Sequence, residues 1–191
     1  MSSLPLLLLF ALLAAAVAHD VRARRIPNAI VFPGALAAIA LHALLPGGQG
    51  LFGVPMGGLG VLSALGGWAL GLAILMPMYA LRLMGAGDAK LLAMVGAFVG
   101  ASQILTVGLV TLVAGGVLAL AFAAWQRSLR RLVGNAYHMA MHTAFSALAG
   151  DVAALVPPPQ AASGRLPYAI AIALATVGCV LWARMNGELP L

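Results

Sequence analysis

Long uninterrupted apolar runs dominate the chain, and short polar clusters separate them. The runs cover residues 4–18, 28–45, 57–81, 89–99, 104–125 and 166–183. Continuous apolar runs of about 20 residues predict membrane-crossing helices, whereas the strands of a membrane barrel would alternate apolar and polar positions. The pattern therefore predicts an all-α fold, a polytopic membrane bundle of about six transmembrane helices.

The fourth and fifth runs need a turn between them. Residues 91–126 carry no charge, and as one helix they would be about 54 Å long at about 1.5 Å per residue. A bilayer core is only about 30 Å thick, so we predict that the chain turns back at Gly100-Ala101-Ser102-Gln103. The fourth span is then too short to cross alone, and its beginning is expected below the membrane surface. Pro77 predicts a kink in the third span.

A more polar connection at about 126–166 precedes the last run. Its residues 132–150 lack charge but contain several polar side chains, so they predict an interfacial helix in preference to a seventh span. His138 and His142 share a face of that helix, but no third ligand is close, and we predict no metal site. We treat residues 1–191 as one membrane-embedded domain.

Composition supports the membrane assignment. Apolar residues make up 63% of the 191 residues and charged residues 7%, which excludes an ordinary soluble globule and a disordered chain. The one cysteine, Cys179, excludes a disulfide framework and a thiolate metal cluster within the chain.

The basic residues give an orientation. With six spans and the N-terminus outside, nine of the ten Lys and Arg residues fall on the cytoplasmic side, and Arg184 alone falls outside. They form no stripe, so we expect no nucleic-acid partner. The first run ends like a signal-peptidase site, but no Lys or Arg precedes it, and a retained first span is the favoured interpretation.

The chain has four carboxylates: Asp20, Asp88, Asp151 and Glu188. We interpret Asp151 and Glu188 as solvated loop charges. Asp20 follows the first span and Asp88 opens the fourth, so both stand at the cytoplasmic boundary, where ionisable groups are costly and usually functional. Two carboxylates held close share one proton near neutral pH, and such a pair supplies the base and the acid that a water-activating peptidase needs.

Both segments resemble a known family. Gly85-Ala86-Gly87-Asp88 resembles the GxGD motif of intramembrane aspartic proteases, and the segment from His19-Asp20 to Ile26-Pro27-Asn28 resembles the first-aspartate segment of type IV prepilin peptidases. Lys90 stands two residues after Asp88, as is common in that family. Leu166-Pro167-Tyr168-Ala169 resembles a late Pro-Tyr segment of the family, with Ala169 where Gly is usual.

The resemblance implies a bacterial inner-membrane enzyme that cleaves the leader of type IV prepilins at the cytoplasmic face. Asp20 and Asp88 would be its catalytic pair, without cofactor or metal, and Gly85, Gly87, Lys90, Pro27 and Asn28 would support them. The prepilin would enter as a transmembrane helix among membrane lipids, and the pilus assembly machinery is a further possible partner. The chain resembles the short form of Flp or tight-adherence pili, which implies cleavage without N-methylation.

Some roles follow from the residues themselves. Gly85 and Gly87 would permit a tight backbone close to the substrate. We expect Asp20, placed past a helix C-terminus, to hold the shared proton more often than Asp88 at a helix N-terminus. Lys90 is interpreted either as a membrane anchor or as a partner of Asp88 or a substrate carboxylate. Tyr168 and Trp182 fit an interfacial belt, and His42 a helix end.

Two other functions stay open at this point. One is a GxGD protease with a different substrate. The other is a non-enzymatic assembly or transport subunit whose acidic residues bind an ion.

Overall fold

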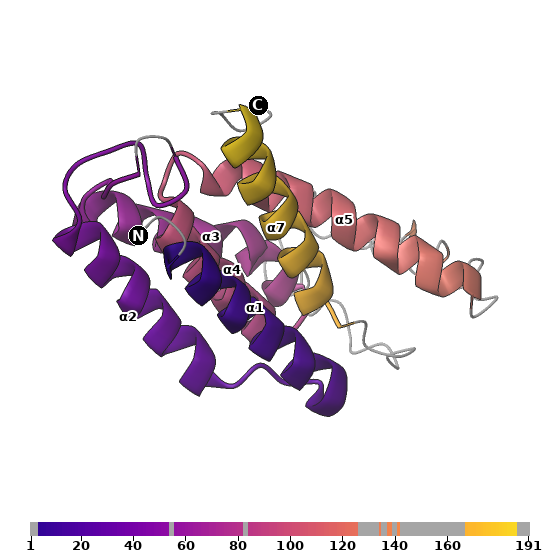
Figure 1. Ribbon diagram of the computed structural model, residues 1–191. Helices are drawn as coiled ribbons and strands as arrows, with labels where there is room; N and C mark the ends of the chain where they lie inside the picture. Colours follow the sequence, from indigo (N-terminus) through magenta and orange to yellow (C-terminus); the bar gives the residue numbers. More distant parts are fainter. Residues whose placement is uncertain are drawn as a thin grey trace, which may run out of the picture.

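The computed structural model describes residues 4–53, 56–81, 84–125 and 167–186 and the single positions 134, 137, 138 and 141. Within these parts the chain is all-α, as predicted (Figure 1). The helices are α1 (Leu4–Ala23), α2 (Asn28–Leu44), α3 (Val61–Ala80), α4 (Ala86–Val99), α5 (Ile104–Trp125) and α7 (Ala169–Asn186).

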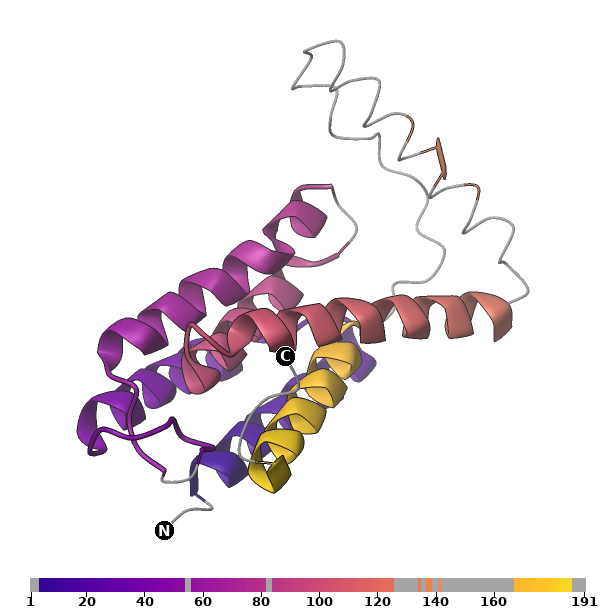
Figure 2. The same ribbon diagram turned by 90° about the horizontal axis from the view of Figure 1, so that it is seen from above.

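Helix α4 forms the centre of the bundle. Nearly every side chain from Leu91 to Val99 is buried, on all sides of the helix. Helices α1, α2, α3 and α7 pack around it, whereas α5 packs on α7 and α3 and extends beyond the other helices at its C-terminal end (Figure 2). A helix with apolar residues on every side is stable when it is buried on every side. This explains why α4, the shortest of these helices, forms the core of the bundle.

Glycines bring α3 and α4 into close backbone contact. A Cβ atom at Gly67 would overlap the carbonyl oxygen of Gly96, and a Cβ at Gly96 would overlap that of Gly67. One turn further along α3, a Cβ at Gly71 would lie 2.6 Å from the carbonyl oxygen of Leu92. In a membrane the hydrophobic effect does not drive helices together. Small residues at the interface let two apolar helices approach closely, and van der Waals contact then stabilises the pair.

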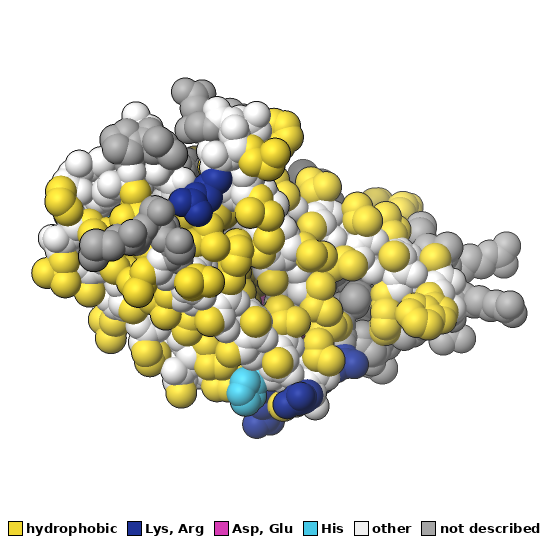
Figure 3. Space-filling view, in the orientation of Figure 1, with side chains coloured by type: hydrophobic (Ala, Val, Ile, Leu, Met, Phe, Trp, Pro, Cys, Tyr) yellow, Lys and Arg dark blue, Asp and Glu magenta, His cyan; other side chains and the backbone are white. Residues whose placement is uncertain are grey.

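In the part of the chain that the structure describes, four helices are long and apolar enough to cross a membrane: Leu4–Ala23, Val61–Ala80, Ile104–Phe122 and Ala169–Asn186. Helix α2 has 17 residues and α4 has 14, so α4 is about 21 Å long at about 1.5 Å per residue. Apolar side chains cover most of the visible face of the molecule (Figure 3), which suits a protein surrounded by lipid. The prediction of a multi-pass helical membrane protein is confirmed, and six complete crossings stay a prediction.

Several predicted boundaries shift in the structure. Helix α1 continues to Ala23, so the expected end at residue 18 is wrong, and Asp20 lies inside the helix. Helix α3 begins at Val61 because Gly57 and Gly58 belong to the preceding loop, where the Gly58 N–H donates to the Pro46 carbonyl at 2.8 Å. The predicted turn at 100–103 is confirmed, with Gly100 at a φ of 85°.

His42 fastens the end of the bundle opposite Asp20. It lies in the last turn of α2, as predicted, and is 2% exposed. Its Nε2 lies 3.1 Å from the Phe98 carbonyl oxygen, and the Leu59 N–H donates to its Nδ1 at 3.0 Å. These two bonds require one protonated and one free ring nitrogen, so they assign a neutral imidazole with the proton on Nε2. His42 thus ties α2, α4 and the loop before α3 together.

The predicted connection at 126–166 lies outside the described residues, apart from single positions. His138 is one of these, and its ring makes an edge contact with Tyr137 at a centroid distance of 5.9 Å. His142 lies outside the described residues.

Candidate active site

Asp20 stands in the last turn of α1 and is 7% exposed. The helix closes around it because Arg24 adopts a left-handed φ of 52°, and the Arg24 N–H donates to the Asp20 carbonyl at 2.9 Å. A left-handed residue just past the last turn is a common helix ending, which glycine usually supplies. The chain reverses there and reaches α2 through Ile26 and Pro27.

Asp88 stands in the first turn of α4. Its Oδ2 accepts a hydrogen bond from the Gly85 N–H at 3.2 Å, and its own N–H donates to the Gly85 carbonyl at 3.2 Å. A carboxylate three residues into a helix satisfies one of the free N–H groups there and interacts favourably with the helix dipole. Gly85 and Asp88 of the GxGD motif therefore build the start of α4 together.

The two motif segments fit each other directly. A Cβ at Gly87 would lie 3.2 Å from the Ile26 Cβ, so the second motif glycine leaves room for the isoleucine that precedes Pro27. Nearby, Lys90 donates to the Asn28 side-chain oxygen at 3.2 Å, and its Nζ lies 5.6 Å from the centre of the Phe32 ring. These contacts join the beginnings of α2 and α4.

The contacts of Lys90 bear on its two interpretations. In the part of the chain that the structure describes, its polar partner is Asn28, and no bond between Lys90 and Asp88 is present. Lys90 therefore connects two helices beside Asp88 without pairing with it.

The start of α7 completes the surroundings of Asp20. The N–H of Ala169, the first residue of α7, donates to the Asp20 Oδ2 at 3.3 Å. The first N–H groups of a helix have no acceptor within it, so the carboxylate of one helix satisfies the end of another. Sequence reasoning missed this contact, although Ala169 lies in the late Pro-Tyr segment.

Asp20 and Asp88 lie within each other's electrostatic reach. Burial and, after it, the charge of Asp20 raise the pKa of Asp88 from 3.8 to about 6, although the Gly85 N–H opposes both effects. Tyr168 belongs to the same cluster, since burial and then the charge of Asp88 raise the pKa of its phenol. The structure thus brings together the ends of α1, α4 and α7.

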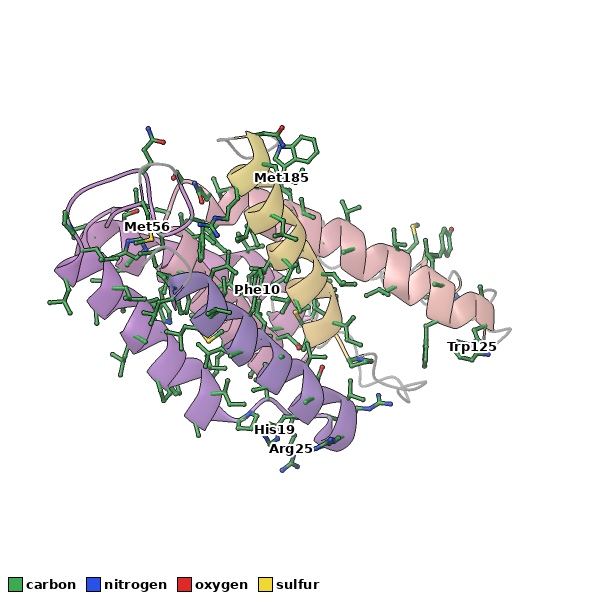
Figure 4. The ribbon with its side chains drawn as sticks, viewed as in Figure 1. Phe10, His19, Arg25, Met56, Trp125 and Met185 are labelled. Carbon is green, nitrogen blue, oxygen red and sulfur yellow. The ribbon has the colours of Figure 1, made fainter. Side chains whose placement is uncertain are left out.

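Of the basic residues beside this cluster, Arg24 acts electrostatically on Asp20. Figure 4 shows His19 and Arg25 at the far end of α1, directed away from the helix bundle. Among the described residues, no group of three or more His, Cys, Asp or Glu side chains is placed to hold a metal ion.

The structure corrects the reason for which Asp20 was expected to hold the shared proton. Asp20 was expected beyond the C-terminus of its helix, where an anion is disfavoured. It lies within α1, and its side chain instead faces the N-terminus of α7 through the Ala169 N–H. The helix terminus that contacts the Asp20 carboxylate is therefore the start of α7.

Taken together, the fold and the cluster define a multi-pass membrane protein with two interacting carboxyls at helix ends. The sequence matches the model of the type IV leader peptidase family over residues 7–120, more than half of the chain. The chain belongs to this family, and its activity class is that of a prepilin peptidase, an aspartic endopeptidase. Comparison with curated proteins and with solved structures gives no match.

The matched range contains Asp20, Asp88 and the residues between them, but it ends at residue 120. Tyr168 and Ala169 lie beyond it and still contact the cluster. The structure therefore extends the candidate site to a part of the chain that the family match does not reach.

Proposed function

We propose that Asp20 and Asp88 are the catalytic pair with which this chain cleaves the leader from type IV prepilins. The observation that carries the proposal is the meeting of two carboxyls from α1 and α4: Asp20 accepts the Ala169 N–H, and its charge adds to the burial that raises the pKa of Asp88. Carboxyls that perturb each other in this way can hold one proton between them, and such pairs mark active sites.

The roles follow from the surroundings of each carboxyl. Asp20, which accepts the Ala169 N–H, acts as the base that takes a proton from water. The resulting hydroxide attacks the scissile carbonyl carbon, while protonated Asp88 gives its proton to the carbonyl oxygen. As the tetrahedral gem-diol collapses, the C–N bond breaks, the proton on Asp20 passes to the leaving amine, and one hydroxyl proton returns to Asp88, which restores the starting protonation of the pair. This assignment reverses the one expected from sequence, because α7 stabilises the anion of Asp20.

The proposal includes an orientation. Arg22, Arg24 and Lys90 lie in or beside the helix ends that form the cluster, whereas Arg184 lies in the last turn of α7, at the opposite end of that helix. An excess of basic residues marks the cytoplasmic side of bacterial inner-membrane proteins. We therefore place the cluster at the cytoplasmic face, the N-terminus outside, and six helices in the membrane, with α4 recessed.

The proposed substrate is a prepilin of the Flp or tight-adherence class, which enters as a transmembrane helix with its leader in the cytoplasm. Lipid surrounds the bundle, and the pilus assembly machinery receives the product. The proposal includes cleavage without N-methylation, as the resemblance to the short form of the family implies.

The decisive experiment is co-expression with an Flp-type prepilin, followed by detection of the mature pilin. Asp20→Asn and Asp88→Asn should each abolish processing, because either change leaves the pair without its base or its acid. Asp151→Asn is the matched control, since it removes an acid that we assign to the connection. Processing that survives both single changes would refute the catalytic pair and favour a non-enzymatic subunit.

Two further measurements test the finer points. Mass spectrometry of the new pilin N-terminus should show no added methyl group when this chain is the only peptidase present. Single cysteines at His19 and Gln49, in a Cys179→Ser background, should react with membrane-impermeant reagents from opposite sides. Labelling of both from the same side would overturn the orientation.

A further inference from the structure

Tyr168 is the side chain in the carboxyl cluster to which the mechanism assigns no role. It stands immediately before α7, and its ring lies against α5 at Gly115. A Cβ at Gly115 would overlap the ring, so the glycine provides the space that the tyrosine occupies. Its hydroxyl donates to the Thr111 carbonyl at 3.4 Å. Residues 111 and 115 are one turn apart, so both contacts lie on one face of α5.

The backbone beside Tyr168 forms the first turn of α7. Its carbonyl accepts the Ile172 N–H at 3.2 Å, and the Pro167 carbonyl accepts the Ile170 N–H at 3.2 Å. The next residue, Ala169, is fully buried and directs its N–H to the Asp20 carboxylate. The side chain that anchors this turn on α5 and the N–H that reaches Asp20 therefore belong to adjacent residues.

We propose that Tyr168 is a positioning residue: its ring, seated in the space at Gly115 and bonded to Thr111, holds the first N–H of α7 on the Asp20 carboxylate. The phenol is not itself an acid or base of the reaction. Its hydroxyl donates its proton to the Thr111 carbonyl of α5 and to neither catalytic carboxyl.

Among the described residues, the charged neighbours of the pair come from α1 and α4. Arg24 on α1 acts on Asp20, and the charge of Asp20 acts on Asp88 at the start of α4. From α7 the contribution is the Ala169 N–H, with the Tyr168 phenol beside Asp88. Loss of the N–H removes a donor to the anion, so the pair should then take up a proton at higher pH.

The test is a titration that does not depend on peptidase activity. The chain has three aspartates, so selective ¹³C labelling of aspartate carboxyls gives three NMR signals, which Asp→Asn variants assign. In the full-length protein, Tyr168→Ala and Gly115→Ala should each raise the lower apparent pKa of the Asp20–Asp88 pair by about one unit, the size expected for a lost bond to a charged acceptor. Tyr168→Phe keeps the ring in place and should shift it by less.

Matched controls separate this effect from general damage. Gly116→Ala changes the adjacent glycine, which has nothing within 4 Å of an added Cβ. Tyr79→Ala removes an exposed tyrosine from α3. Both should titrate like the unchanged protein. If Gly115→Ala and Tyr168→Ala titrate like these controls, the proposal is overturned; if Tyr168→Ala does not fold, Gly115→Ala and Tyr168→Phe decide.

A second test measures the kinetics of prepilin cleavage. It rests on the proposed function, and its result is interpreted separately from the titration. Tyr168→Ala should lower kcat for prepilin cleavage about tenfold, move the acid limb of the pH–rate profile upward by the same unit, and leave KM unchanged. A shifted titration with unaltered cleavage would sink the catalytic pair while leaving the positioning role standing. Altered cleavage with an unshifted titration would sink the positioning role alone.

Discussion

The raised pKa of Asp88 predicts a stability that falls as pH rises. In the folded protein this carboxyl keeps its proton up to about pH 6, whereas its ordinary value is 3.8. Between these values the folded state binds more protons than the unfolded state, so acid favours folding there. The gap is about two units, and at about 1.4 kcal/mol per unit the buried carboxylate destabilises the fold by about 3 kcal/mol at pH 7.

The perturbation that isolates this term is Asp88→Asn. Asparagine keeps an oxygen that can accept the Gly85 N–H, but it carries no charge at any pH. From pH 4 to pH 7, the wild-type protein should therefore lose about 2.5 kcal/mol of unfolding free energy relative to Asp88→Asn, and little more above pH 7. Titrating groups that do not interact with Asp88 are common to both proteins and cancel in the difference, which leaves Asp88 with its coupled neighbours Asp20 and Tyr168.

The assay is thermal unfolding of the purified protein in one detergent, in steps from pH 4 to pH 8, with Asp151→Asn as a charge-matched control. Asp20→Asn adds a second check: without the charge of Asp20, the pKa of Asp88 should fall and the pH-dependent loss should shrink. Parallel curves for wild type and Asp88→Asn would refute the reasoning, and so would a wild-type curve that rises with pH.

Two further predictions concern the packing of the bundle. Gly67→Ala places a methyl group on the backbone of Gly96 and should cost about 1–3 kcal/mol of unfolding free energy, whereas Gly178→Ala, with nothing within 4 Å, should cost none; equal midpoints for the two would contradict the close contact. His42→Ala should lower stability by about 3 kcal/mol, because it removes a buried ring and leaves the Leu59 N–H without its acceptor. The aspartate titration should not move in the His42 variant, and a shift would show that the two ends of the bundle are coupled.

Much of the architecture could be predicted from the apolar pattern alone. Helix positions and the turn at Gly100 follow from run length and from a glycine with positive φ, both of which are local properties. The end of α1 was missed because polar residues after residue 18 indicate where the chain leaves the membrane, and a helix does not have to end there. Length explains why the shortest span was expected to be recessed, but its burial on every side depends on its neighbours.

The candidate site was predictable in part. The motif segments identified Asp20 and Asp88, and the fit of Ile26 on Gly87 explains why the two segments occur together. The contribution of α7 could not be derived in the same way, because 149 residues separate Asp20 from Ala169 and no local rule connects them. Tyr168 was assigned to an interfacial belt on residue type alone, although its own segment had already pointed to the family.

The bond between Asp20 and Ala169 also sets an order for biosynthesis. Asp20 belongs to the first of the described helices and Ala169 to the last, so Asp20 is synthesised well before Ala169 (Figure 1). During synthesis the Asp20 carboxylate therefore lacks the Ala169 N–H donor until α7 has been inserted and has packed against α5 and α1. A nascent chain therefore carries both aspartates before it carries the helix that completes their surroundings, and the carboxyl pair reaches its final environment only after α7 has been made.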